Sequence, residues 1–149
     1  SNLKITLQKN YIVGGIVGSI EGGATVRECS VENLTIDSKR GPYVGYIVGN
    51  LASQNAVSAI TDCTVANSTL VGRADKFTGN EETYTVQNGD HDCPNAYYVG
   101  SGVSVDANGK VTAGTFEYLP DALVAEGFAA KTDPTTGKII VEEEAPAEE

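Results

Sequence analysis

The residues that could carry out a reaction are few, and the single histidine limits them most. His91 is the only histidine in the 149 residues, so a Ser-His-Asp or Cys-His mechanism would have to use it. Cys93 lies two residues away and could share one face of a strand with His91, but no third residue can be named that would orient the pair. The sequence therefore predicts no catalytic residue, and we expect that the chain is not an enzyme.

The same segment carries the best candidates for metal ligands. Asp90 and Asp92 could supply oxygen ligands to Ca²⁺, and His91 with Cys93 could hold a softer metal. The other ligands of an EF-hand loop, including its distant glutamate, are missing, and no Cys-x-x-Cys spacing suggests a zinc site. We favour a hydrated loop and expect no metal and no other cofactor.

Carboxylates and tyrosines could instead recognise or cleave polysaccharides. Glu28, Glu32 and Asp62 could face solvent as the paired acids of glycoside cleavage, although isolated acids on a solvated strand are the ordinary outcome. Exposed tyrosines could form a strip on which sugar rings stack, whereas buried tyrosines would pack a core, which is the interpretation that we favour. The tyrosines in question are Tyr11, Tyr43, Tyr46, Tyr97 and Tyr98.

An internal repeat predicts the elements that position these residues. Residues 11–18, Tyr-Ile-Val-Gly-Gly-Ile-Val-Gly, match residues 42–49, Pro-Tyr-Val-Gly-Tyr-Ile-Val-Gly, at an offset of 31. Residues 26–35 match residues 60–69 at an offset of 34. Such a fixed period, with frequent glycines and β-branched residues, favours short strands over helices.

Stacked copies of this unit would form a β-solenoid, in which equivalent strands pair in parallel about 4.8 Å apart. We expect copies near residues 11–41 and 42–72, a degenerate copy from Tyr97, and an insertion over 72–95 between them. The second half of each unit predicts two short strands with a bend near Ser30 or Val31. Residues 1–10 alternate in the manner of a strand from a preceding coil, through Leu3, Ile5 and Leu7.

Two of the three cysteines, Cys29 and Cys63, occupy the same position in successive copies. They could form a disulfide or bind a metal together. Side chains of stacked parallel strands run side by side and suit disulfide geometry poorly. We therefore predict two buried, reduced thiols.

The repeat also resembles a known family. The first copy contains Val13-Gly14-Gly15-Ile16-Val17-Gly18 followed by Glu28-Cys29, and the second contains Val44-Gly45-Tyr46-Ile47-Val48-Gly49 followed by Asp62-Cys63. Over about residues 11–72, these motifs resemble the GLUG repeats of bacterial surface and secreted proteins, with Ile in place of Leu and with Tyr46 in a glycine position. The resemblance implies an adhesin-like, extracellular or cell-surface scaffold without catalytic residues.

The C-terminal third predicts two hairpins and one short helix. Asn108-Gly109 favours a tight turn between residues 103–105 and 111–112, and residues 132–137 favour a turn between 128–131 and 138–141. Pro120, Asp121 and Gly127 favour a helix over 119–127. This order resembles the end of right-handed β-helix surface proteins. Since an open end of a solenoid exposes strand edges, we expect residues 112–141 to form a cap.

The composition restricts the partners and the location of the protein. The net charge is −10, which opposes binding to nucleic acid, and no apolar run is long enough to enter a membrane. Residues 142–149 hold five glutamates and predict an acidic tail or linker beyond a solenoid of residues 1–111 and the cap. The absence of Met suggests that the chain is a piece of a longer protein.

We therefore expect a right-handed parallel β-helix of two to three repeats with a C-terminal cap. Its expected role is structural or adhesive, with further repeats of the parent chain upstream and a host or microbial surface glycan or protein as partner. The alternative is a carbohydrate-binding module or a fragment of a polysaccharide-active β-helix enzyme.

Overall fold

The computed structural model describes residues 2–7, 12–20, 23–38, 43–51, 56–71 and 97–146. Across these residues the regular elements are strands and one 3-10 turn, so the predicted all-β class is confirmed. The repeat region holds β1 (Leu3–Leu7), β2 (Ile12–Gly14), β3 (Val17–Ile20), β4 (Thr25–Arg27), β5 (Ser30–Glu32), β6 (Leu34–Ser38), β7 (Tyr43–Gly45), β8 (Val48–Leu51), β9 (Ser58–Thr61), β10 (Thr64–Ala66) and β11 (Thr69–Val71). The C-terminal region holds β12 (Tyr97–Val105), β13 (Val111–Tyr118), η1 (Asp121–Leu123), β14 (Phe128–Thr132) and β15 (Ile139–Glu143).

The two copies of the repeat stack in parallel with the offsets that the sequence predicts. Strands β2 and β3 pair with β7 and β8 at an offset of 31, as in Val13 with Val44. Strands β4, β5 and β6 pair with β9, β10 and β11 at an offset of 34, as in Val31 with Val65. The predicted strand before the first copy is also confirmed, because β1 pairs in parallel with β6. Equivalent residues therefore lie one above another.

The bends between strands fall at different residues from those predicted. The left-handed region of φ is occupied at Glu28 (53°) and Asp62 (55°), and again at Asn33 (58°) and Asn67 (50°). The predicted bend near Ser30 or Val31 is therefore wrong, because those residues lie inside β5 and the chain turns on either side of it. Each unit consequently carries three short strands in its second half instead of two.

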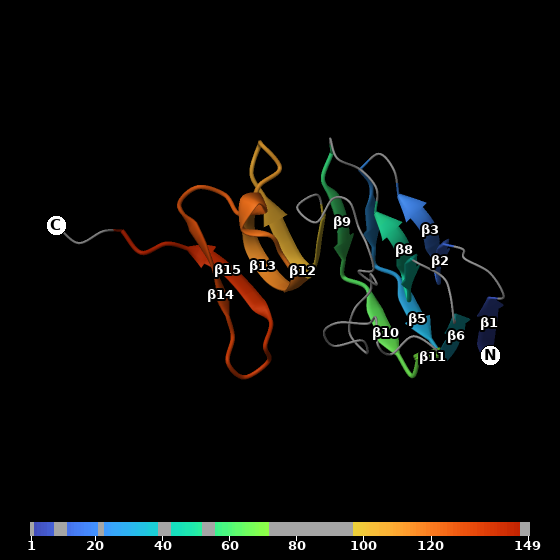
Figure 1. The fold of residues 1–149 in the computed structure, drawn as a ribbon. Helices are drawn as coiled ribbons and strands as arrows, with labels where there is room; N and C mark the ends of the chain where they lie inside the picture. Colours follow the sequence, from blue (N-terminus) through green and yellow to red (C-terminus); the bar gives the residue numbers. More distant parts are fainter. Residues whose placement is uncertain are drawn as a thin grey trace.

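A continuous apolar core fills the interior of the stacked copies. Branched side chains that point inward from successive strands pack together there, including Ile36, Val44, Ile47 and Ile60. Figure 1 shows these strands at one end of the molecule, with β12 to β15 toward the other end. The core is therefore shared between the copies, and each coil buries its apolar face against its neighbour.

The third copy differs from the prediction in its register. The motif Tyr-Tyr-Val-Gly at 97–100 resembles the first half of the unit, yet Tyr97 pairs with Ser58 of β9 in the second half. The alignment at Tyr97 was therefore wrong. Beyond Gly100, β12 has a bulge with Gly102 at a φ of 62°, but it does not end as β4 and β9 do, and it continues as one arm of an antiparallel hairpin with β13.

The cap grows directly out of the sheet of the repeats. One sheet has the strand order β14-β15-β13-β12-β9-β4, parallel from β4 to β12 and antiparallel from β12 onward. Since side chains alternate along a strand, β12 contributes to two cores. Tyr97 and Val99 join the core of the repeats, whereas Tyr98 joins a second core around Phe116 and Leu123.

Both predicted hairpins are confirmed. Strand β12 pairs with β13, and β14 pairs with β15, each in antiparallel register. In the first turn the Asp106 carboxylate accepts hydrogen bonds from the backbone N–H groups of Asn108 and Lys110, and Gly109 has a φ of 76°. In the second, the Asp133 carboxylate accepts from the backbone N–H of Thr135 and from the hydroxyl of Thr136. Both turns are thus held by an aspartate side chain.

The predicted helix over 119–127 is wrong. The chain forms only the 3-10 turn η1, and Val124 is already extended, with φ −81° and ψ 135°. The backbone N–H of Ala125 donates to the carbonyl of Val111, so this segment bonds to the first residue of β13 instead of to itself. A single helical turn gains too few internal hydrogen bonds to compete with such pairing. Gly127 does adopt a positive φ of 84°, but it leads into β14.

The end of the chain also differs in detail from the expected tail. Glu142 and Glu143 lie in β15, opposite Ala129 and Phe128 of β14. Glu142 accepts a hydrogen bond of 2.8 Å from the ammonium group of Lys131 on the exposed surface. The acidic run therefore begins inside the cap sheet.

Candidate functional site

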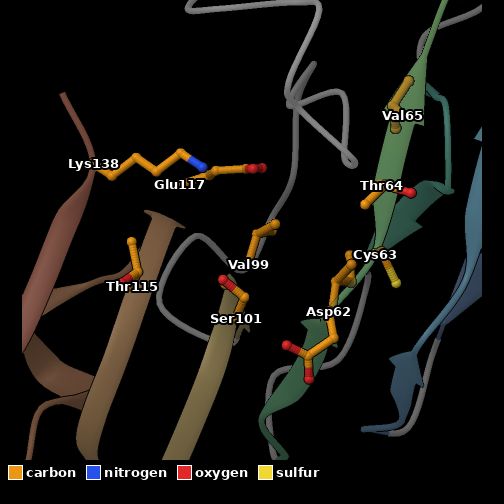
Figure 2. Close-up of a pocket in the computed structure, with 11 residues that line it drawn as sticks. Asp62, Cys63, Thr64, Val65, Val99, Ser101, Thr115, Glu117 and Lys138 are labelled. Carbon is orange, nitrogen blue, oxygen red and sulfur yellow. The ribbon is translucent and has the colours of Figure 1, made fainter. Parts of the chain in front are cut away.

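A pocket of about 310 Å³ opens where β12 leaves the path of the repeats. One side of it comes from the bend after β9 and from β10, and the other side comes from β12, β13 and the start of β15. Figure 2 shows side chains from both sides directed into the space between them. The described residues that line it are Ile60, Asp62, Cys63, Thr64, Val65, Val99, Gly100, Ser101, Thr115, Glu117 and Lys138.

The alternation of side chains along β12 and β13 determines which residues enter this pocket. Phe116 is fully buried in the cap core, so its neighbours Thr115 and Glu117 point to the opposite face of β13. Val99 and Ser101 face the same way from β12. The pocket is therefore the space left between the cap sheet and β10, which pairs with β5 and with no other described strand.

Glu117 is the most unusual of these residues. Its Oε2 atom is buried and has no hydrogen-bond partner among the described residues. Burial raises the pKa of the Glu117 carboxyl, and the positive charge of Lys138 acts in the opposite direction. A buried acceptor without a partner costs free energy, so a side-chain rotation that brings this oxygen to a donor in the pocket would be favourable.

Other polar groups surround Glu117. Lys138 lies just before β15, and Figure 2 shows its side chain extending beside Glu117. On the opposite side, the Asp62 carboxylate accepts a hydrogen bond of 3.0 Å from the backbone N–H of Gly102, which ties the bend after β9 to β12. Ser101 and Thr115 add hydroxyl groups. The pocket therefore has a positively charged donor, negatively charged acceptors and hydroxyl groups. Its apolar part is formed by Ile60, Val65 and Val99.

The two stacked cysteines are free thiols, as predicted, but they are partly exposed instead of buried. Burial raises the pKa of the Cys63 thiol, a hydrogen bond from the Cys29 backbone lowers it, and the Cys29 thiol raises it further. The Cys63 thiol lies 3.4 Å from the carbonyl oxygen of Thr61 and also lines the pocket. The prediction of full burial was wrong because the bends at Glu28 and Asp62 turn the chain just before each cysteine, which leaves both at a corner of the coil.

The favoured interpretation, tyrosines that pack a core, holds for the tyrosines whose side chains the structure describes, and these do not form an exposed strip for sugar stacking. Tyr46, Tyr97 and Tyr98 are at most 7% exposed. The Tyr97 ring stacks on Tyr118 at 4.5 Å, and Tyr98 meets Phe116 edge to face at 5.8 Å. These rings pack the two cores, because β12 alternates between them. The side chain of Tyr43 and the whole of Tyr11 lie outside the described residues.

The three candidate carboxylates are exposed, and they do not all line the pocket. Glu28 and Asp62 occupy equivalent bends, and Glu32 lies on β5. Only Asp62 lines the pocket.

The metal candidates Asp90 and Asp92, together with His91 and Cys93, lie outside the described residues. Within the described ranges, no group of three or more His, Cys, Asp or Glu side chains could hold a metal ion. In the same ranges, no helix has the length and apolar character needed to span a membrane.

Sequence reasoning missed Glu117 and Lys138. Glu117 alternates with Phe116 along a strand, which does indicate that the two side chains face opposite ways. The sequence pattern could not show that the side of β13 that carries Glu117 faces β10, because this depends on how β12 pairs with β9.

Comparison with known proteins supports the repeat family. Residues 9–37 match the model of the Glug family, described as the GLUG motif. Comparison with curated proteins and with solved structures finds no match.

Proposed function

We propose that this chain is the C-terminal end of a right-handed parallel β-helix, a rigid, non-enzymatic structural and adhesive module of a secreted or cell-surface bacterial protein. Further GLUG coils of the parent chain would stack on its N-terminal face. The parallel pairing of two copies and the Glug match support a stack of repeats. The right hand follows the strong preference of crossovers between parallel strands.

One observation carries this proposal: equivalent residues of successive turns of the chain differ in exposure. Ile16 is 47% exposed, whereas its equivalent Ile47 is completely buried. Leu3 is 58% exposed, and its equivalent Leu34 is 3% exposed. The turn of residues 3–33 covers the turn that begins at Leu34, and nothing in the described residues covers residues 3–33 in the same way. The exposed residues of this N-terminal face are apolar, like their buried equivalents in the next turn. This favours another coil as the partner that covers the face.

Two equivalent glycines, Gly18 and Gly49, also favour another coil on the N-terminal face. A Cβ atom on Gly49 would lie 2.6 Å from the carbonyl oxygen of Val13 and 2.8 Å from that of Gly18, so close stacking of the coils requires glycine there. At the equivalent Gly18, no described atom lies within 4 Å of such a Cβ. A preceding coil stacked in the same way would make glycine necessary at Gly18 too.

The opposite end is closed by the antiparallel hairpins, which continue the β4-β9-β12 sheet. A terminal cap of this kind suits a rod, because it pairs the last strand and covers apolar side chains such as Tyr98. The burial of Tyr46, Tyr97 and Tyr98 favours this scaffold over a carbohydrate-active module that stacks sugar rings on these tyrosines.

The proposal can be tested by adding the coil. Residues 11–33 are repeated immediately before Leu3, in place of Ser1 and Asn2, so that the 31-residue period of β1 and β6 is kept. We expect a higher denaturation midpoint and slower amide hydrogen exchange in β2 and β3. The control carries aspartate at the two added positions that correspond to Ile16 and Val17. Equal stability of the extended protein, its control and the original chain would rule out a coil-binding face.

A further inference from the structure

We propose that the pocket between β10 and the cap binds a single sugar ring, through its hydroxyl groups, with Glu117 and Lys138 as the principal contacts. This inference deepens the adhesive part of the proposed function and rests on it, since it assigns a ligand class to that role. The binding measurement below does not depend on whether a coil covers the N-terminal face, so the two proposals can fail separately.

The unpartnered Glu117 oxygen determines what kind of group the ligand must bring. Oε2 is buried within the pocket wall and has no hydrogen-bond donor among the described residues. Solvent does not reach this atom, so a ligand meets it only when the Glu117 side chain turns toward the pocket, and the ligand must then donate a hydrogen bond to the carboxylate. Ligands that carry only acceptors, such as inorganic anions, do not satisfy this requirement.

Lys138 indicates which kind of donor on the ligand fits best, namely a hydroxyl group. Its ammonium group is close enough to influence the Glu117 carboxyl electrostatically, so the same small region offers one acceptor and one cationic donor. A hydroxyl group both donates and accepts, and can therefore bridge the two. A second cation beside Lys138 would meet repulsion, which disfavours amine ligands.

The remaining walls suit a compact polyol. Ser101 and Thr115 bring hydroxyl groups to the space, and Asp62 presents a carboxylate from the repeat side. Val65 and Val99 provide an apolar patch that could contact the C–H face of a ring. The volume of about 310 Å³ lies at the small end of the range found for ligand pockets, roughly 300 to 1,000 Å³, which fits one ring and not a long chain.

The backbone around the pocket is held in place before any ligand arrives. The Asp62 carboxylate bonds to the backbone N–H of Gly102, and the backbone N–H of Asp62 donates to the carbonyl of Gly100 at 2.9 Å. These contacts join the repeat wall to the cap wall on one side of the site. A site fixed in this way needs little ordering when it binds.

The test uses the full chain and four methyl glycosides as probes, those of glucose, galactose, mannose and N-acetylglucosamine. Amide NMR shifts are followed during titration. We expect at least one glycoside to give saturable shifts confined to the amides around the pocket, such as Asp62, Gly102, Thr115 and Glu117. Replacing Lys138 by Met or Glu117 by Gln should weaken that binding about tenfold, because each change removes a hydrogen bond to a charged group.

Matched controls come from the same cap. Lys131→Met and Glu126→Gln alter an exposed lysine and an exposed glutamate that do not line the pocket, and they should bind the glycoside as the original chain does. The absence of saturable shifts with all four glycosides would overturn the inference. So would shifts that Lys138→Met and Glu117→Gln leave unchanged, or saturable binding of glycine without binding of any glycoside.

Discussion

Gly49 and Gly18 occupy the same position in successive copies, and their surroundings differ. A Cβ on Gly49 would approach backbone atoms of the neighbouring coil to 2.6 Å, whereas a Cβ on Gly18 would meet no described atom within 4 Å. Gly49→Ala should therefore destabilise the chain by about 1 to 3 kcal/mol, as overpacking does in other cores, and Gly18→Ala should have little effect. Urea denaturation of both variants measures the difference. Equal losses would show that the stacking of the two coils is less close than described.

Glu117 should make stability depend on pH. Because burial raises its pKa in the folded state, the native protein binds a proton more strongly than the unfolded chain does. Its contribution is therefore fully favourable below the pKa of the unfolded state and is lost as the pH rises through the raised pKa of the folded state. Glu117→Gln should raise the free energy of unfolding at pH 7 relative to the original chain, and the gain should shrink at pH 4. Chemical denaturation at the two pH values measures this. A gain that is the same at both would contradict a raised pKa, and Glu126→Gln serves as the exposed control.

At the scale of elements, the left-handed bends determine how each coil turns. Glu28 adopts a positive φ that asparagine tolerates better than glutamate, and the equivalent bends at Asn33 and Asn67 already hold asparagine. Glu28→Asn should stabilise the chain by up to about 1 kcal/mol, and Asn33→Ala should destabilise it by a similar amount. Thermal denaturation tests both. A loss of stability in Glu28→Asn would indicate that the glutamate side chain has a role that its contacts do not reveal.

The cap should be needed to keep the last coil soluble. Deleting residues 112–149 would uncover the face of β9 and β12 that carries Ala59 and Tyr98, and would leave β12 with an unpaired edge. We expect aggregation, measurable by light scattering. Deleting only residues 145–149 should change little, since they follow the last bonds of the cap. A soluble, monomeric chain without residues 112–149 would show that the hairpins are not a cap.

The elements were predictable where the pattern was repeated, and less so where it occurred once. Two matching copies gave the offsets of 31 and 34 and the pairing of Val13 with Val44. Tyr97 had only a four-residue resemblance, and its register depends on pairing with β9, which no local pattern encodes. The prediction of a helix over 119–127 was wrong because Pro120, Asp121 and Gly127 are equally consistent with a turn. The backbone hydrogen bond from Ala125 to Val111 favours the turn. The pocket could not be predicted because it lies between elements whose register was unknown.

At the scale of the whole molecule, we propose a rod with one closed end and one open end. The cap continues the sheet of the repeats, whereas the first coil leaves Leu3 and Ile16 exposed. Hydrogen exchange should therefore be fastest in β1, β2 and β3 and slowest in β9, β12 and β13. The opposite order of protection would place the stable end of the rod at the N-terminal coil.

The central claim is that the N-terminal face of this chain is an interface for another coil. The most direct test measures how Gly18→Ala changes the free energy of unfolding, first in the original chain and then in the chain extended by the added coil of residues 11–33. We predict a negligible effect in the 149-residue chain, where the added methyl group meets open space. In the extended chain we predict a loss of about 1 to 3 kcal/mol, because a stacked coil would place backbone atoms against Gly18 as the first coil does against Gly49. The same small effect in both proteins would contradict the claim.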